Sequence, residues 1–483
     1  MTRFDSKLIG AGLARSLTKV TVLAAFLISI SAQAAIDGVP GTTFNLTASE
    51  GYISIADGGS VYSWGYSLDG QMQLPGPTLI VDAGATVTVT LTNGLPAAAG
   101  NVSIVFPGQD VSISETDQGV QGELTHEAPS GGTVTYTFTA SNPGTYQYHS
   151  GTQPDLQVEM GLYGALIVRP NATDLAAAAC AAPSYADATH ASAAYAHPDT
   201  CFDREYLFLL SEIDIDIHQA AELQAGGAGP IVLPAGAYHS EYWLMNGRAA
   251  PDTMAAAGDA LLTSQPYNIL PRMHPGEKLL IRLVSAGREM HPFHTHGNHA
   301  RVLARDGRLL TSEPGGAGQL SGPLLFTIPS VPGGTVDAIF EWTGKELGWD
   351  MYGHPADDVD VPPLDDPSVA DDFPGTGDTD NNGNGVVDIT LLEPHEWAPD
   401  HGRPIPVDLP SLSSLAFGGF YSGSPYLGAL GSLPPGEGGL NPDAGFTYMW
   451  HSHNERELVN NDVFPGGMMT MLIVEAPGVT ITE

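Results

Sequence analysis

Four histidines lie close together near the middle of the chain. The segment 291–299 reads HPFHTHGNH and contains His291, His294, His296 and His299. Neutral imidazole is a good ligand for copper, zinc, iron and nickel. On a β-strand, side chains two residues apart point to the same face. A strand here would point His294 and His296 to one face and His291 to the other, so one segment could supply ligands to two separate metal sites. The alternative is a solvated, histidine-rich loop.

The rest of the sequence predicts short β-strands joined by tight turns. Residues 87–91 (VTVTL) and 134–138 (VTYTF) alternate apolar and polar side chains, as half-buried strands do. The chain contains 58 glycines and 38 prolines, which separate these runs, and no long segment has the period of an amphipathic helix. We therefore predict an all-β protein built from sandwiches or barrels.

Two further segments place histidines at the ends of predicted strands. Residues 143–151 read PGTYQYHSG, and residues 448–457 read YMWHSHNERE. Together with the HPFHTHG segment, they resemble the copper motifs of the multicopper oxidases. Residues 74–84 (LPGPTLIVDAG) and 161–170 (GLYGALIVRP) resemble the same family. The pairing of an HPFHxHG motif with a later HxH motif makes this resemblance specific.

The resemblance implies a fold of tandem cupredoxin-like Greek-key β-sandwiches. We expect domain 1 at residues 35–170, a linker at 171–203 and domain 2 at 204–483, with a long acidic, Gly/Pro-rich insertion at about 350–445. Three domains, the middle one degenerate, are the alternative. Two-domain relatives often form homotrimers, so the resemblance also makes a homo-oligomer a possible partner arrangement.

The resemblance further implies a copper centre with fewer ligands than the family pattern. Multicopper oxidases carry a type 1 copper, held by cysteine and histidine, and a trinuclear copper cluster held by histidines. Histidine is kept at five cluster positions: His149, His294, His296, His451 and His453. His291 corresponds to a remnant of the type 1 site. Five imidazoles are compatible with one copper, a copper pair, zinc or a vacant relict site.

The remaining motif positions have lost their ligands. The first motif, expected to read HWHG, reads VFPG at residues 105–108, and the partner of His149 is Gly151. Ser452 stands at the type 1 cysteine position and Glu457 at its second histidine. Since a serine hydroxyl is a poor substitute for a thiolate, we expect a copper-dependent oxidoreductase without type 1 copper, acting on a small molecule or a metal ion. The alternative is a redox-inactive cupredoxin-like protein for copper binding, sequestration or cell-surface interaction.

The N-terminal segment and the charge of the chain indicate an exported protein. Residues 1–34 combine basic side chains, a short apolar run and a small-residue ending, as secretory signal peptides do. We expect cleavage near Ala34 and a secreted or periplasmic location. The formal net charge of −37 disfavours nucleic acid as a partner. No segment has the apolar length of a membrane span.

Two further sites follow from residue type and spacing. In an exported protein, Cys180 and Cys201 most simply form one disulfide. Within the insertion, oxygen-bearing side chains have the spacing of an EF-hand-type calcium loop: Asp380, Asn382, Asn384 and Asp388. Leu391 stands where such loops carry an acid, so an Asn/Gly-rich turn is the alternative to calcium.

Overall fold

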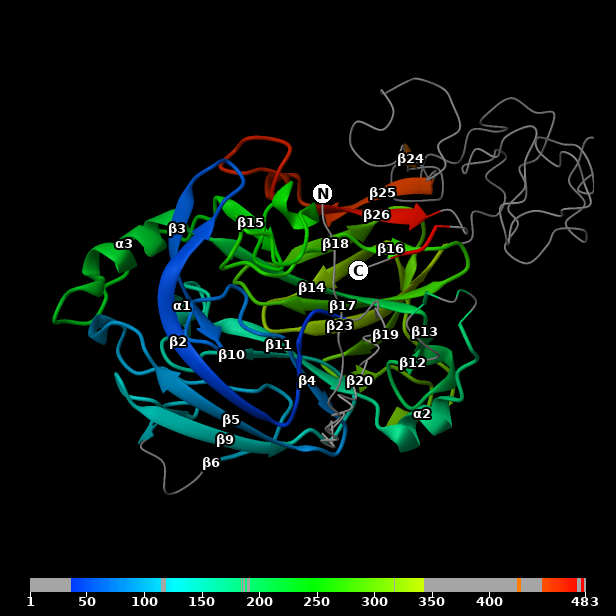
Figure 1. Ribbon diagram of the computed structural model, residues 1–483, viewed down its shortest axis with the longest axis horizontal. Helices are drawn as coiled ribbons and strands as arrows, with labels where there is room; N and C mark the ends of the chain where they lie inside the picture. The colour runs from blue at the N-terminus through cyan, green and yellow to red at the C-terminus, as the bar shows by residue number, and fades with distance from the viewer. Residues whose placement is uncertain are drawn as a thin grey trace, which may run out of the picture. The chain divides into compact units, whose positions relative to one another are not determined.

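The structure is a computed structural model that describes residues 36–113, 119–183, 185, 187–188, 192–316, 318–342, 424–426, 445–475 and 479–481 (Figure 1). The predicted signal peptide lies outside the described residues, and so do the predicted calcium ligands Asp380, Asn382, Asn384 and Asp388. The predicted insertion lies outside them too, apart from residues 424–426 and 445. No helix among the described residues is long and apolar enough to cross a membrane.

Residues 39–169 form two larger β-sheets that share one hydrophobic core. The four-stranded sheet runs in the order β1 (Val39–Pro40), β4 (Leu79–Asp82), β11 (Tyr163–Arg169), β10 (Gly144–His149). The five-stranded sheet runs in the order β3 (Ser60–Ser67), β2 (Thr43–Ser54), β5 (Thr86–Asn93), β9 (Thr133–Thr139), β6 (Val111–Ile113). The short strands β7 (Val120–Gln121) and β8 (His126–Glu127) pair separately. The alternating runs of the sequence fall on β5 and β9, where Val89 lies opposite Tyr136 and both side chains are buried in that core.

The second half of the chain repeats this arrangement with two larger sheets. One runs in the order β15 (Tyr242–Met245), β14 (Arg204–Ile213), β17 (Lys278–Ser285), β23 (Thr335–Glu341), β19 (Ala300–Arg305), β20 (Arg308–Leu309), with β21 (Leu324–Leu325) also on β19. The other runs in the order β16 (Arg272–Met273), β26 (Met469–Glu475), β25 (Gly445–Ser452), β18 (His291–Thr295), β22 (Thr327–Ser330), with β24 (Ser424–Tyr426) also on β25. Ile281, Phe293 and Trp450 belong to the core between them. The all-β prediction is confirmed in its coarser form: the described residues form a mostly β structure of several sheets.

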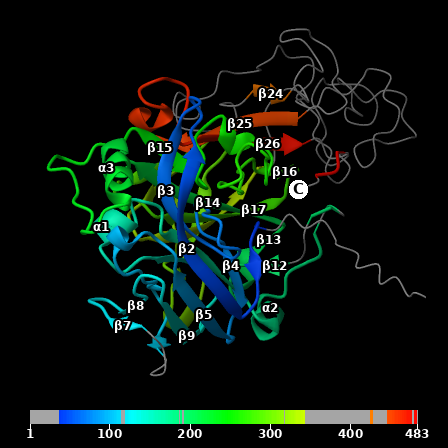
Figure 2. The ribbon, with the colours of Figure 1, turned by 60° about the vertical axis from the view of Figure 1, so that its left-hand side comes forward.

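A short helix, α3 (Ile215–Ala225), departs from the all-β expectation. Asp214 caps its first turn by accepting hydrogen bonds from the main-chain N–H groups of Asp216 and Ile217, at 3.0 and 3.3 Å. Ile217 and Ala221, four residues apart, face the core of the first half of the chain. The helix therefore lies beside β3 (Figure 2). Two shorter helices are α1 (Pro154–Gln157) and α2 (Ala172–Ala178).

The connection between the two halves contains the predicted disulfide. Cys180 and Cys201 are bonded to each other, which confirms the prediction, and neither cysteine is free. Cys201 begins β13 (Cys201–Phe202), which pairs with β12 (Ser192–Ala193). The side chains of Tyr195 and Phe202 pack on the outer face of the β17–β23 sheet. The connection therefore packs against the second half of the chain.

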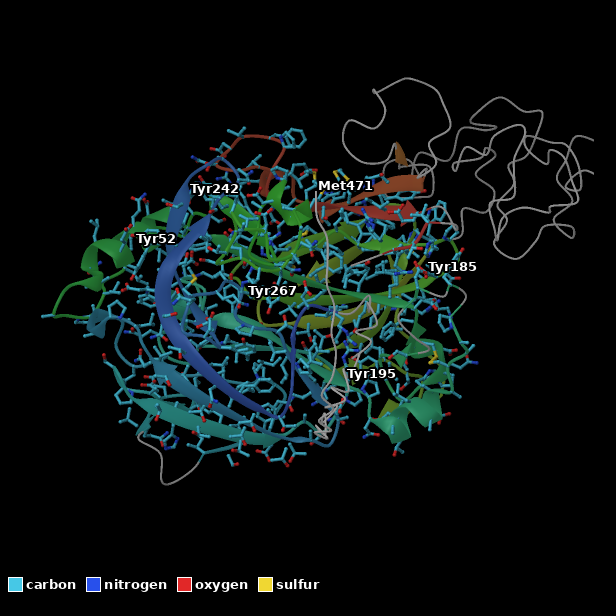
Figure 3. The ribbon with its side chains drawn as sticks, viewed as in Figure 1. Tyr52, Tyr185, Tyr195, Tyr242, Tyr267 and Met471 are labelled. Carbon is cyan, nitrogen blue, oxygen red and sulfur yellow. A yellow bond between two sulfur atoms is a disulfide. The ribbon has the colours of Figure 1, made fainter. Side chains whose placement is uncertain are left out.

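Buried polar contacts join β10 of the first half to β17 and β23 of the second. Thr145 donates a hydrogen bond to Asp337 at 2.5 Å, and Tyr195, labelled in Figure 3, donates to the other oxygen of the same carboxylate. Arg282 lies 3.7 Å from Asp337 and donates to Glu205 at 2.8 Å. All five side chains are buried. A buried charge needs paired and hydrogen-bonded partners, and Asp337 has both: hydrogen bonds from Thr145 and Tyr195 and an ion pair with Arg282.

Replacing Asp337 with alanine is expected to destabilise the fold strongly. The change leaves Arg282 with one carboxylate partner and leaves the hydroxyls of Thr145 and Tyr195 without their acceptor. Breaking a buried ion pair from one side costs about 3–5 kcal/mol. Chemical or thermal denaturation followed by circular dichroism measures the change. Glu341→Gln, an exposed position on the same strand, is the matched control and should change stability by less than about 0.5 kcal/mol. Equal effects of the two variants would contradict this account.

Candidate metal centre

The pairing of β18 with β25 brings histidines from two distant segments face to face. His294 and His451 are directly opposite each other in this antiparallel pair. Directly opposed residues have their side chains on the same face of the sheet. His296 follows the end of β18, and its main-chain N–H donates to Met449 of β25 at 3.3 Å. One strand pair therefore positions three imidazoles.

The three imidazoles have ring nitrogens close enough together for one metal ion. One nitrogen each of His294, His296 and His451 lies within 4.8 Å of the others. The Nε2 atoms of His296 and His451 are 3.3 Å apart. His453 is a fourth neighbour, with its ring centroid 4.6 Å from that of His294 and 5.7 Å from that of His451. Four of the five histidines predicted as cluster ligands are thus gathered here.

Hydrogen bonds to the outer nitrogens fix the orientation of two of these rings. Nδ1 of His294 lies 2.7 Å from the hydroxyl of Thr327 on β22, and Nδ1 of His451 lies 2.6 Å from the carbonyl oxygen of Ser452. The Nε2 atom of His294 is buried and has no hydrogen-bond partner among the described residues. Metal-binding histidines commonly have their second nitrogen held in this way. Both rings therefore turn Nε2 toward the shared space.

His294 and His451 are electrically neutral at neutral pH. Burial, and to a smaller extent the charges of the neighbouring imidazoles, lower the pKa of His294 to about 3. Burial also lowers the pKa of His451 to about 4, although its hydrogen bond to the Ser452 carbonyl opposes the shift. Neutral imidazole has a free nitrogen lone pair, which is the form that binds metals. A metal would not have to displace protons from His294 and His451 at neutral pH.

His149, the fifth predicted cluster ligand, is not in this group of three metal-capable histidines. It ends β10, and its main-chain groups form a bridge with Val105, with N–O distances of 2.8 and 3.2 Å. The VFPG segment, predicted to stand at the first motif, thus lies directly beside His149, but it offers only apolar side chains. Burial lowers the pKa of His149, and its Nδ1 lies 2.9 Å from the carbonyl of Ser150.

His291 lies between two buried carboxylates. Its Nε2 is 3.0 Å from Glu212 of β14, and its Nδ1 is 2.9 Å from Glu457 in a 3-10 turn, η7 (Glu455–Leu458). All three side chains are at most 1% exposed. Burial favours the neutral ring, but the hydrogen bonds and charges of Glu212 and Glu457 outweigh it and raise the pKa of His291 to about 9. The sequence placed Glu457 beside His291 through the resemblance, but it gave no signal for Glu212.

A second group of metal-capable side chains was not predicted from the sequence. Asp187, His274 and Glu277 lie close together, but Arg204 is already among them. Arg204 lies 2.6 Å from Glu277 and 3.3 Å from Asp187. The guanidinium supplies the positive charge that these acids would otherwise seek from a metal ion. This group is therefore a buried ion-pair network.

The comparisons with known proteins agree with the sequence motifs over part of the chain. Residues 48–173 match the family model described as multicopper oxidase. Laccase 1 of Metarhizium acridum is 38% identical over 98 residues, which cover 20% of this chain and 15% of that protein. An L-ascorbate oxidase of Brassica rapa subsp. pekinensis is 38% identical over 96 residues, covering 20% of this chain and 16% of that protein. These matches span less than a fifth of the length of either relative.

Solved structures of similar proteins cover more of the chain at lower identity. A multicopper oxidase, mgLAC, is 17% identical with a TM-score of 0.48, covering 92% of this chain and 88% of its own. The blue copper oxidase from Nitrosomonas europaea is 18% identical with a TM-score of 0.48, covering 89% and 85%. The match to the family model covers residues 48–173, and over these residues the chain is similar to the multicopper oxidases.

Proposed function

We propose that this protein binds copper through His294, His296 and His451, with His453 beside them, and acts as a copper-dependent oxidoreductase that lacks type 1 copper. One observation supports the proposal most directly. Three imidazoles converge, and the Nε2 of His294 is buried without a partner among the described residues. A buried polar atom without a partner costs free energy, and a bound metal ion would remove that cost.

The donor set fits copper. Imidazole nitrogen is a ligand for copper and zinc alike, and divalent copper binds a given nitrogen site more tightly than zinc does. Copper bound here would supply one-electron redox chemistry, which zinc does not. The protein's own contribution is to orient the rings through Thr327 and the Ser452 carbonyl, and to keep His294 and His451 unprotonated. His149 stays a predicted ligand of the same centre.

The proposal excludes type 1 copper on the basis of two contacts. Both nitrogens of His291 face carboxylate oxygens, which only accept hydrogen bonds when ionised. Both nitrogens must then carry hydrogen, so His291 is an imidazolium and has no lone pair for a metal. In addition, Cys180 and Cys201 are the chain's two cysteines and are bonded to each other, so no thiolate is available.

A redox-inactive copper-binding protein is the second proposal. The observation that favours it is the apolar VFPG segment beside His149, which offers no imidazole where the family pattern has two. Such a protein would bind copper in the same three-histidine group but would not turn over a small-molecule or metal-ion substrate with oxygen. Export to the cell exterior or periplasm, calcium binding and a homotrimer stay predictions under either proposal.

Copper titration of the metal-free protein tests the site itself. We expect about one tightly bound copper per chain, a Cu(II) electron paramagnetic resonance spectrum with nitrogen hyperfine structure, and no intense blue absorption band. The double variant His294→Ala/His451→Ala should bind copper more than about 100-fold more weakly, because loss of a ligand's hydrogen-bond partner alone costs about 10–100-fold.

The control for this titration is His239→Ala. His239 is a surface histidine with a 63% exposed side chain, so its loss should leave copper binding unchanged. Copper that binds equally well to the double variant would refute the site. Copper binding without oxygen uptake on phenols or Mn(II) would favour the redox-inactive alternative.

The stability of the metal-free protein should depend on pH through His291. Its pKa of about 9 in the folded state lies above the ordinary value of 6.5. The ion pairs of His291 with Glu212 and Glu457 therefore stabilise the fold fully below about pH 6.5, and this stabilisation is lost as the pH rises through about 9. Glu457→Gln should cost about 3 kcal/mol at pH 6, and this difference from the wild type should shrink toward pH 9.

Urea denaturation at several pH values measures this difference. Glu455→Gln is the matched control, since Glu455 is two residues away and its side chain is 87% exposed. The control should change stability by less than about 0.5 kcal/mol at any pH. If the loss of unfolding free energy caused by Glu457→Gln does not vary with pH, His291 is not a positively charged imidazolium between the two carboxylates.

A further inference from the structure

An open cleft of about 830 Å³ lies on the outer face of the β17–β23–β19 sheet. The strand register explains which side chains line it. Lys278 of β17 is opposite Glu341 of β23, and Arg301 of β19 is opposite Ile339 of β23. Glu341 and Ile339 are two residues apart and share a face. Lys278 and Arg301 therefore flank β23 on one face of the sheet, two strand spacings across and two residues along, roughly 12 Å apart.

The two cations of the cleft are unusual in this acidic chain. Apart from Lys278, the lysines all lie outside the described residues. Neither Lys278 nor Arg301 forms an ion pair within the part of the chain that the structure describes, whereas most other described arginines do. Lys278 has acidic neighbours in Glu341, across the strand pair, and Asp203, whose carboxylate accepts its main-chain N–H at 2.7 Å. The acids Asp199 and Glu341 line the cleft as well, and the strand register places Glu341 opposite Lys278 and not opposite Arg301.

Arg301 is placed as an anchor for a carboxylate. Its cross-strand neighbours are Ile339 on one side and Leu324 on the other, both apolar. Its Nη1 donates to the carbonyl of Gly322 at 3.0 Å, which restrains the half-buried guanidinium. A restrained guanidinium with free N–H groups matches the planar geometry of a carboxylate. The neighbouring apolar side chains can pack against the body of the same ligand.

The cleft reaches toward the histidine centre. His299 lines the cleft, and its ring centroid is 4.8 Å from that of Phe326. The Phe326 ring is in turn 5.7 Å from that of His294. One aromatic ring thus separates a side chain of the cleft from a proposed copper ligand. A molecule in the cleft would lie close to the metal centre, on a path that does not involve the His291 side of β18.

We propose that this cleft binds a small organic carboxylate with an apolar body, its carboxylate on Arg301 and its body on Ile339, Leu324 and Leu303. Lys278 adds long-range attraction at the other side of β23. If the proposed function holds, this carboxylate is the substrate that the copper centre oxidises; that role rests on the proposed function. Binding itself depends only on the side chains of the cleft. With the His291 site closed to copper, this cleft is the entry point for an electron donor beside His294.

Calorimetric titration of the metal-free protein with benzoate tests the binding step. Benzoate is expected to bind, and benzamide, its neutral analogue, at least about 10-fold more weakly. Arg301→Gln should reduce benzoate affinity about 10-fold or more, and Lys278→Gln less. Arg305→Gln removes an exposed charge at the end of the same strand, outside the cleft, and should leave affinity unchanged. Equal binding of benzoate and benzamide, or equal effects of Arg301→Gln and Arg305→Gln, would overturn the proposal.

A second measurement separates this proposal from the proposed copper site. In copper-loaded protein, Cu(II) should broaden the proton resonances of bound benzoate, and the His294→Ala/His451→Ala variant should abolish the broadening but keep benzoate binding. Benzoate binding to a protein that takes up no copper would refute the copper site and leave the cleft standing. Copper uptake with no benzoate binding would refute the cleft and leave the copper site standing. Benzoate that binds without broadening would place it elsewhere and refute the cleft.

Discussion

The antiparallel pairing of β18 with β25 is the interaction on which the proposed site depends. It sets His294 opposite His451, two residues between which the whole predicted insertion lies in the sequence. A shift of the register by one residue would turn every side chain of the strand to the other face and would separate the two imidazoles. Pairing of β18 with β22 on its other edge brings Thr327 opposite His294. Two neighbouring strands thus supply both the second ligand and the hydrogen bond that orients the first.

Two histidines on β18, three residues apart, have opposite protonation states for a local reason. His291 faces Glu212 and Glu457, so its positive charge is compensated on both sides. His294 faces other imidazoles, which offer no negative charge, so burial dominates and the ring stays neutral. The same rule covers two of the buried arginines. Arg204 and Arg282 each lie within 4 Å of two carboxylates. Buried Arg248 instead donates to main-chain carbonyls, among them those of Gln265 and Ala255.

The sequence predicts local features of this fold well and long-range contacts poorly. Alternation at residues 87–91 and 134–138 corresponds to β5 and β9, because strand periodicity is a property of neighbouring residues. The helix α3 was missed because it is short and only Asp214, Ile217 and Ala221 mark it. Motif positions located four of the clustered histidines, since the resemblance carries tertiary information.

Neither a local pattern nor the motif resemblance predicted the contacts of Thr327 with His294 and of Glu212 with His291. Each depends on which strand becomes the neighbour of β18 or packs against it, and no local pattern encodes that choice. Lys278 and Arg301 are similar cases. They come from strands that are not consecutive in the chain, and only the position of β23 between them places both on one cleft. The sequence showed which residue types were present, but it did not predict the order in which the strands lie in the sheets.

The two faces of β18 also differ in how well their buried polar atoms are satisfied. Losing a metal from a buried site leaves ligand atoms without partners, at a cost of about 1–3 kcal/mol for each. On the His291 face, the carboxylates of Glu212 and Glu457 occupy both nitrogens, so no such cost remains. On the other face, the Nε2 of His294 keeps its cost within the described residues. A site that had lost all function would be under no constraint to keep that atom buried and aimed at two other imidazoles. The difference between the faces therefore supports the proposal that the His294 face binds a ligand, whereas the protein's own carboxylates already satisfy His291.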